Sequence, residues 1–134
     1  MKKLVLFALM STLLFAEGYK EFAKEMSYET NYETALNKAK KENKNLMVLM
    51  ISNFCPWCTK FEKKTLTDKT VDGALKSKYI PLIINKEEGN FPSYLTAPVV
   101  PTVFFVKANE EKVLHENVGF SSKAEFLNLL KQLK

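Results

Sequence analysis

The chain has 134 residues, which is enough for one domain and too short for two of ordinary size. Hydrophobic residues make up 46% and aromatic residues 12%, so the chain has the apolar material of a packed core and is not disordered as a whole. The formal net charge is +5, but its basic side chains are all lysines that alternate with acidic ones, which argues against nucleic-acid binding.

Residues 1–16 have the pattern of a secretory signal peptide. Lys2 and Lys3 give a basic start, and residues 4–15 form an apolar run that is too short to span a bilayer. We expect cleavage after Ala16, which leaves 17–134 as a single exported domain. Because Leu14 is not a small residue, an uncleaved anchor is the alternative. The pattern is typical of a bacterial signal and predicts the periplasm, where disulfides persist.

The rest of the chain is predicted to alternate between helices and strands. Two capping boxes mark helix starts, Thr30 with Glu33 and Ser122 with Glu125. Continuous apolar runs are typical of strands buried on both faces. In chain order we expect a short edge strand near 26–28, a helix over 31–43, a strand over 46–52, a helix from 57, a short helix that Asp68 caps and that ends at 76, strands over 79–85, 102–107 and 113–118, and a C-terminal helix from 123.

This order of elements predicts the fold class. It begins as a strand–helix–strand unit and ends with two strands and a helix. We therefore expect an α/β fold with a central mixed β-sheet that is flanked by helices on both faces. No linker interrupts the pattern, so the elements belong to one domain.

The chemistry of the chain is expected at Cys55-Pro56-Trp57-Cys58, between a buried strand and a helix. Cysteines at this spacing can close a disulfide across one helical turn, and a helix N-terminus stabilises the thiolate of the first one. We expect Cys55 to attack a substrate disulfide, and the more buried Cys58 to resolve the mixed disulfide. Pro56 suits the first helical turn, and we expect the aromatic side chain of Trp57 to be partly exposed beside Cys55. No cofactor is needed beyond the disulfide itself.

The cysteine pair has other interpretations. A zinc site needs four ligands, and His115 is the only histidine in the chain. Covalent haem attachment requires a histidine where the chain has Thr59. A structural disulfide, two inert buried thiols and a Cu(I) site with Met47 or Met50 remain as alternatives. The position of the motif between a strand and a helix favours thiol–disulfide exchange.

From about residue 30 to residue 134 the chain resembles the thioredoxin superfamily, and within it the small periplasmic branch that includes the SoxW-type proteins. The resemblance lies in the apolar run before the motif, in Val100-Pro101-Thr102, and in Gly119 before a capped final helix. It implies the thioredoxin fold, with Pro101 as the cis-proline that packs against the disulfide. It also implies that the backbone of Val100 binds an extended substrate strand.

The chain departs from cytoplasmic thioredoxins around the motif. Pro-Trp stands where they have Gly-Pro between the cysteines, and Phe54 stands where they have tryptophan. Leu49 occupies the position of their buried aspartate, so the acceptor of the Cys58 proton is left open between water and Glu62.

These departures bear on the direction of electron flow. Pro56 and Val100 are similar to the oxidant DsbA, but the stretch between Cys58 and Pro101 is too short for the helical insertion of that class. We therefore expect a reductase of protein disulfides, a monomer that a membrane electron carrier of the DsbD/CcdA type keeps reduced. A DsbA-like oxidant and a Cu(I)-handling dithiol module are the alternatives.

Overall fold

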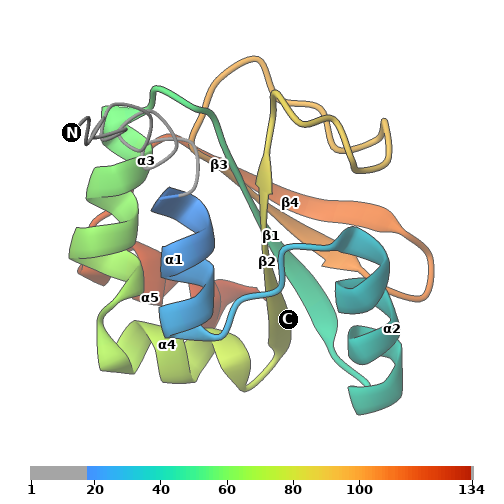
Figure 1. Cartoon of the computed structure of the whole chain (residues 1–134). Helices are drawn as coiled ribbons and strands as arrows, with labels where there is room; N and C mark the ends of the chain where they lie inside the picture. The colour runs from blue at the N-terminus through green and yellow to red at the C-terminus, as the bar shows by residue number, and fades with distance from the viewer. Residues whose placement is uncertain (1–17, 134) are drawn as a thin grey trace, which may run out of the picture.

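The computed structural model describes residues 18–133, so the predicted signal peptide lies outside the described residues (Figure 1). Within that range, helices pack on both faces of a four-stranded sheet. The elements are α1 (Gly18–Met26), α2 (Tyr32–Glu42), β1 (Asn45–Ile51), α3 (Pro56–Phe61), the π-helical turn η1 (Glu62–Leu66), α4 (Lys69–Lys76), β2 (Tyr79–Asn85), β3 (Thr102–Lys107), β4 (Lys112–Val118) and α5 (Lys123–Gln132).

The sheet has the strand order β2-β1-β3-β4. Strand β1 runs parallel to β2 and antiparallel to β3, and β4 pairs antiparallel with β3. The predicted mixed sheet is therefore confirmed. The central position of β1 explains its apolar run, because a strand with neighbours on both sides and helices on both faces has no exposed side.

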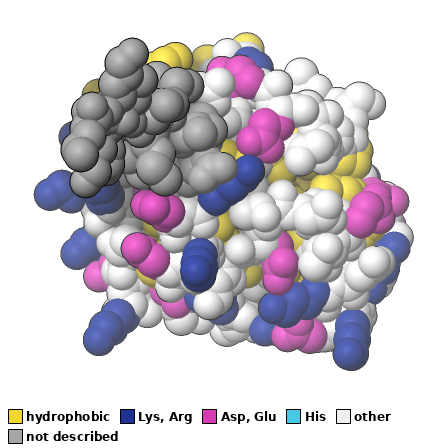
Figure 2. Space-filling view, viewed as in Figure 1, with side chains coloured by type: hydrophobic (Ala, Val, Ile, Leu, Met, Phe, Trp, Pro, Cys, Tyr) yellow, Lys and Arg dark blue, Asp and Glu magenta, His cyan; other side chains and the backbone are white. Residues whose placement is uncertain are grey.

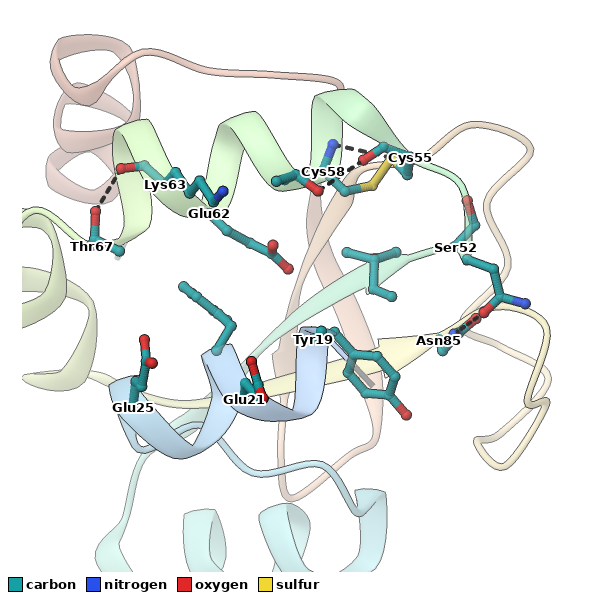
Figure 3. A pocket seen from close by; sticks show the side chains of 15 residues that line it. Tyr19, Glu21, Glu25, Ser52, Cys55, Cys58, Glu62, Lys63, Thr67 and Asn85 are labelled. Atoms are coloured by element: carbon teal, nitrogen blue, oxygen red, sulfur yellow. Dashed lines mark hydrogen bonds between the residues drawn. A yellow bond between two sulfur atoms is a disulfide. The ribbon is translucent and has the colours of Figure 1, made fainter. Parts of the chain in front are cut away.

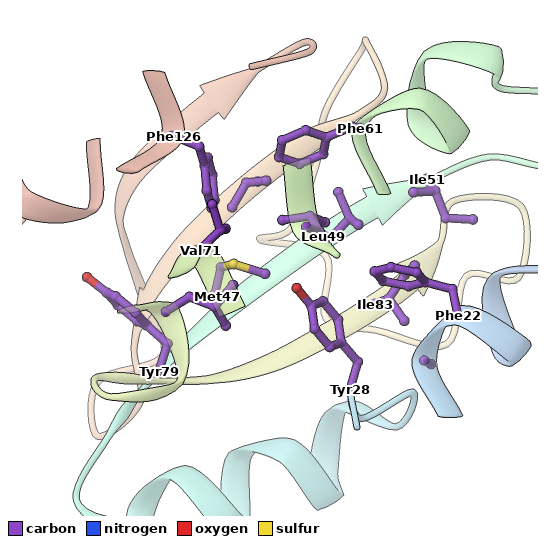
Figure 4. Close-up of a cluster of buried hydrophobic side chains, with 14 of the residues drawn as sticks. Phe22, Tyr28, Met47, Leu49, Ile51, Phe61, Val71, Tyr79, Ile83 and Phe126 are labelled. Carbon is purple, nitrogen blue, oxygen red and sulfur yellow. The ribbon is translucent and has the colours of Figure 1, made fainter. Parts of the chain in front are cut away.

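Alternate residues of β1 enter two different cores. Met47, Leu49 and Ile51 face α1, α3, α4 and α5, where they join the larger cluster (Figure 4). Leu46, Val48 and Met50 face α2 and the segment 91–97 on the other side of the sheet. Full burial of such a side chain contributes about 1.5–3 kcal/mol, so this one strand holds both layers of helices on the sheet.

Local capping explains where three of the helices begin. Asp68 accepts hydrogen bonds from the backbone N–H groups of Thr70 and Val71, as the sequence predicts for α4. Ser122 and Glu125 form the predicted capping box of α5. At α2, however, the cap is Asn31 and not Thr30, because the Asn31 side chain takes the free N–H of Thr34. Asparagine and threonine are both good caps, so sequence did not separate them.

The expectation of a short edge strand near 26–28 is wrong, because residues 18–26 form helix α1. Tyr19, Phe22 and Ala23 follow the spacing of one helical face, and all three are buried against the larger core. The pairing with the sheet that does occur here is an isolated bridge between Glu29 and Leu82.

The visible surface mixes charges of both signs. Lysine and acidic side chains are interspersed over the face in Figure 2, in agreement with the alternation of Lys and Glu in the sequence. No helix within residues 18–133 is long and apolar enough to cross a bilayer.

Candidate active site

Cys55 and Cys58 form a disulfide at the start of α3, where the chain leaves the end of β1. Cys55 is the N-cap of α3, and its Sγ accepts a hydrogen bond of 3.1 Å from the backbone N–H of Cys58. Pro56 is the first residue of the helix, where its missing N–H costs nothing. Cys58 is 3% exposed and belongs to the larger core, whereas Cys55 is partly exposed. The geometry thus distinguishes an outer from an inner sulfur, as the sequence predicts.

Large apolar side chains stand in solvent beside the outer sulfur. Phe54 is 92% exposed and Trp57 is 56% exposed. The Trp57 ring lies 5.8 Å from the ring of Phe120, and the Lys60 ammonium sits 4.6 Å from the Trp57 centroid. A cation over an aromatic face is attracted to it, so Lys60 and Phe120 hold Trp57 in place beside the motif.

Val100 and Pro101, the residues expected to bind the substrate strand, lie immediately before β3. The Val100–Pro101 peptide bond is cis, which is the isomer that the resemblance implies. Val100 packs against the larger core, as Cys55 does, so the structure brings the two predicted segments to the same cluster. The backbone N–H of Gly119 donates to the Pro101 carbonyl at 2.7 Å. Gly119 has φ +86°, a backbone conformation that glycine adopts without strain.

A polar network fixes the loop between β1 and the motif. Asn85, which is 2% exposed at the end of β2, donates its side-chain amide to Oδ1 of Asn53 at 2.7 Å. Glu87 accepts from the Asn53 backbone N–H and donates its own backbone N–H to Asn85. These bonds tie the residues just before Cys55 to the neighbouring parallel strand.

A cavity of about 410 Å³ opens beside the disulfide, between α1 on one side and α3 with η1 on the other (Figure 3). Both cysteines line it, together with the ends of β1 and β2. Glu62, four residues after Cys58, points its carboxylate into this cavity in Figure 3. Tyr19 and Phe22 of α1 form the opposite wall.

Burial changes the acidity of Glu62. Glu62 is 8% exposed. This burial raises the pKa of Glu62 to about 7, and the positive charge of Lys63 lowers the same pKa by a smaller amount. The hydroxyl of Tyr28 faces the same core, and burial together with Asp72 and Glu62 raises the pKa of Tyr28. Glu62 therefore changes its protonation near neutral pH, in the cavity that Cys58 also lines.

Two other predicted residues have structural roles. Met47 lies in the cluster that contains Cys58, but Met50 lies in the cluster on the opposite face of the sheet. The two methionines therefore cannot approach the cysteines together. The His115 ring lies 6.1 Å from that of Phe105 and is half-buried on β4.

The family model for a thioredoxin-like domain matches residues 32–134. The chain belongs to this thioredoxin-like family. With a disulfide of CXXC spacing at the start of α3, it is a thiol:disulfide oxidoreductase. Helix α1 precedes the matched residues, so one wall of the cavity lies outside the family domain.

Solved structures agree with this assignment. A thioredoxin from Thermus thermophilus is 25% identical with a TM-score of 0.68, covering 78% of this chain and 85% of that one. The C-terminal domain of DsbD from Neisseria meningitidis, in the reduced form, is 21% identical with a TM-score of 0.57, covering 76% of this chain and 93% of that one. No curated protein matches the chain. At these identities the DsbD domain shows a shared fold, and the SoxW-type branch stays a prediction.

Proposed function

We propose that this thioredoxin-like protein is an exported reductase of protein disulfides, which acts in the periplasm as a monomer. A membrane electron carrier of the DsbD/CcdA type would return it to the dithiol form. The observation that carries the direction is the compact connection from Cys58 to Pro101. Within it the described chain contains η1, α4, β2 and a loop over 86–101, with no helical insertion of the oxidase type.

The proposed cycle uses the outer and inner sulfurs in turn. The Cys55 thiolate attacks a substrate disulfide, and the Cys58 N–H that bonds Cys55 Sγ helps to hold that thiolate. Cys58 then gives its proton to the Glu62 carboxylate and attacks Cys55 Sγ. The Cys55–Cys58 bond forms, the mixed disulfide breaks, and the second substrate sulfur leaves as a thiolate that takes up a proton. The substrate is reduced by two electrons and the protein is oxidised by two.

The surface around the motif fits a polypeptide substrate. Phe54, Trp57 and Val99 are all more than half exposed, an arrangement that favours contact with apolar side chains of a partner. The backbone of Val100, next to the cis bond, is the site where an extended substrate strand would pair.

The reduction potential of the Cys55–Cys58 pair tests the direction. It is measured by equilibration in glutathione buffers, with the fluorescence of Trp57 as the reporter. A reductase requires a value below about −200 mV, towards the thioredoxin end of the scale. A value near −120 mV would overturn the proposed direction and favour the DsbA-like oxidant, which Pro56 and Val100 suggest.

A further inference from the structure

The cavity beside the disulfide is strongly acidic. Glu21 and Glu25 of α1 line it from one side, and Glu62 lines it from the other. Lys63 is the one basic side chain in the described lining. The loop after β2 adds further negative charge, because Glu87 bonds the cavity residue Asn53 and Glu88 accepts from the hydroxyl of Tyr19.

Glu62 lines this cavity, and its carboxylate has no partner among the described residues. Glu62 is more than nine-tenths buried, and it makes no hydrogen bond or ion pair with any residue in the range 18–133. Figure 3 shows the carboxylate directed into the space between η1 and α1. The carboxylate therefore faces the open cavity with no hydrogen-bonded partner among the described residues, and a positive group that enters the cavity would pair with it.

We propose that the cavity is a subsite for a cationic side chain of the disulfide substrate, a lysine or arginine close to the substrate cysteine. This inference rests on the proposed thiol–disulfide exchange and names the class of substrate that the site prefers. Cys55 and Cys58 line the same cavity, so a group that enters it can belong to the molecule joined to Cys55 in the mixed disulfide.

The subsite depends on an element that lies outside the family match. Both glutamates at the cavity mouth, Glu21 and Glu25, belong to α1, and the family match begins only at residue 32. Both side chains are exposed, so each can pair with an incoming cation without a desolvation cost. Glu62 is the more buried of the three carboxylates. A cation there would also favour the ionised form of Glu62, which is the form that can accept the Cys58 proton.

Small symmetric disulfides test the proposal. Cystamine carries two ammonium groups, dithiodiglycolate carries two carboxylates, and 2-hydroxyethyl disulfide is neutral. Each oxidises the reduced protein in one turnover: the two thiols become the Cys55–Cys58 bond, the probe disulfide breaks, and two probe thiols are released. Rates are measured by Trp57 fluorescence at low salt and divided by the rates of the same probes with dithiothreitol, which corrects for intrinsic reactivity.

The overall charge of the protein and the proposed subsite predict opposite preferences between the cationic and the anionic probe. The positive net charge of the protein favours the anionic probe, whereas the subsite favours cystamine. We expect cystamine to react about fivefold faster than dithiodiglycolate after the correction, and the preference to shrink with salt. In the double variant Glu21→Gln/Glu25→Gln the preference should fall about threefold. Glu33→Gln, an exposed carboxylate on α2, is the matched control and should leave it unchanged.

A corrected ratio of the cystamine rate to the dithiodiglycolate rate of one or less would overturn the subsite. A ratio that the double variant leaves unchanged would also overturn it. Failure of the exchange chemistry is a different result, because the reduced protein would then not react with the neutral probe either. A wrong direction of electron flow is also separable, since the preference is a ratio of forward rates and does not depend on the reduction potential.

Discussion

Burial of the Glu62 carboxyl links the stability of the fold to pH. Because its pKa rises from 4.5 to about 7, the folded protein holds this proton more tightly than the unfolded chain does. The stabilisation by the protonated form is complete below pH 4.5, and it is lost as the pH rises through 7. Above that pH the fold must keep an ionised carboxylate in a buried position.

We therefore expect Glu62→Gln to stabilise the protein at high pH. The amide has nearly the shape of the protonated acid and does not ionise. Between pH 4 and pH 8 the wild type should lose about 3 kcal/mol of unfolding free energy relative to the variant. Urea unfolding of the disulfide form at a series of pH values measures this difference. Glu116→Gln, exposed on β4, is the control, and parallel curves for wild type and Glu62→Gln would contradict the prediction.

The same variant tests Glu62 as the proton acceptor. With a peptide disulfide at pH 7, Glu62→Gln should slow the resolution of the mixed disulfide about tenfold or more, because Cys58 loses its base. The first attack by Cys55 is measured separately in Cys58→Ser, which stops at the mixed disulfide. The defect should shrink near pH 9, where a thiol with a pKa of ~8.5 ionises by itself. An equal defect at both pH values would indicate a structural effect instead.

At the level of secondary structure, the π-helical turn η1 positions Glu62. The N–H of Thr67 bonds the Glu62 carbonyl five residues earlier, at 3.1 Å. The buried hydroxyl of Thr65 donates to the Ser121 carbonyl at 2.6 Å, which ties η1 to the start of α5. Sequence placed a helix here but could not show the π-turn, because the turn depends on a partner 56 residues away along the chain.

Helix α1 shows a different limit of sequence reasoning. The apolar spacing of Tyr19, Phe22 and Ala23 is a helical signal, but it lies directly after the expected cleavage site and covers only nine residues. Short helices are stabilised mainly by packing, so the decisive information was the apolar face of the larger core. The cavity was missed with the helix, since α1 forms half of its wall. Glu62 itself was found from sequence because it follows Cys58 by one helical turn.

Helix α1 should control both the stability of the fold and the acidity of Glu62. Phe22 is 8% exposed, packs edge-to-face on Tyr28 and lines the cavity. Phe22→Ala should cost about 3–5 kcal/mol in unfolding free energy. It should also admit water to the cavity, so the pKa of Glu62 should fall from about 7 towards 4.5.

Carboxyl NMR titration and urea unfolding measure the two effects. Leu36→Ala in α2 is the control, since Leu36 is 4% exposed in the core on the opposite face of the sheet. It should cost about 2–5 kcal/mol and leave the Glu62 titration unchanged. An unchanged titration in Phe22→Ala would show that α1 does not dehydrate the carboxyl.

For the whole molecule, the fold class followed from sequence because a few strong patterns fix it. The apolar runs of β1 and β2 identify the buried strands, and the caps at Asp68 and Ser122 set the starts of α4 and α5. The motif could be assigned because it stands where a central strand meets a helix. The polarity of the cavity could not, because its residues come from α1, η1 and two strand ends that only the folded chain brings together.

The direction of electron flow is also a property of the whole fold. The potential of a CXXC pair differs from that of the unfolded chain by the difference in stability between the disulfide and dithiol forms, at about 1.4 kcal/mol for each 30 mV. A strong oxidant such as DsbA has the more stable reduced form. A reductase should show the opposite order, with the disulfide form as the more stable one.

We expect the disulfide form of this protein to unfold at higher urea than the dithiol form at pH 7. In the disulfide form, Cys58 packs in the larger core, and the Cys58 N–H donates to Cys55 Sγ. Reduction places a thiol in that apolar core and removes the cross-link. Unfolding with and without dithiothreitol gives the difference, and the Cys55→Ser/Cys58→Ser variant shows any effect of the reductant alone. If the dithiol form proves more stable, the fold drives the pair towards oxidation of its substrates, and the proposed direction is wrong even where the exchange chemistry holds.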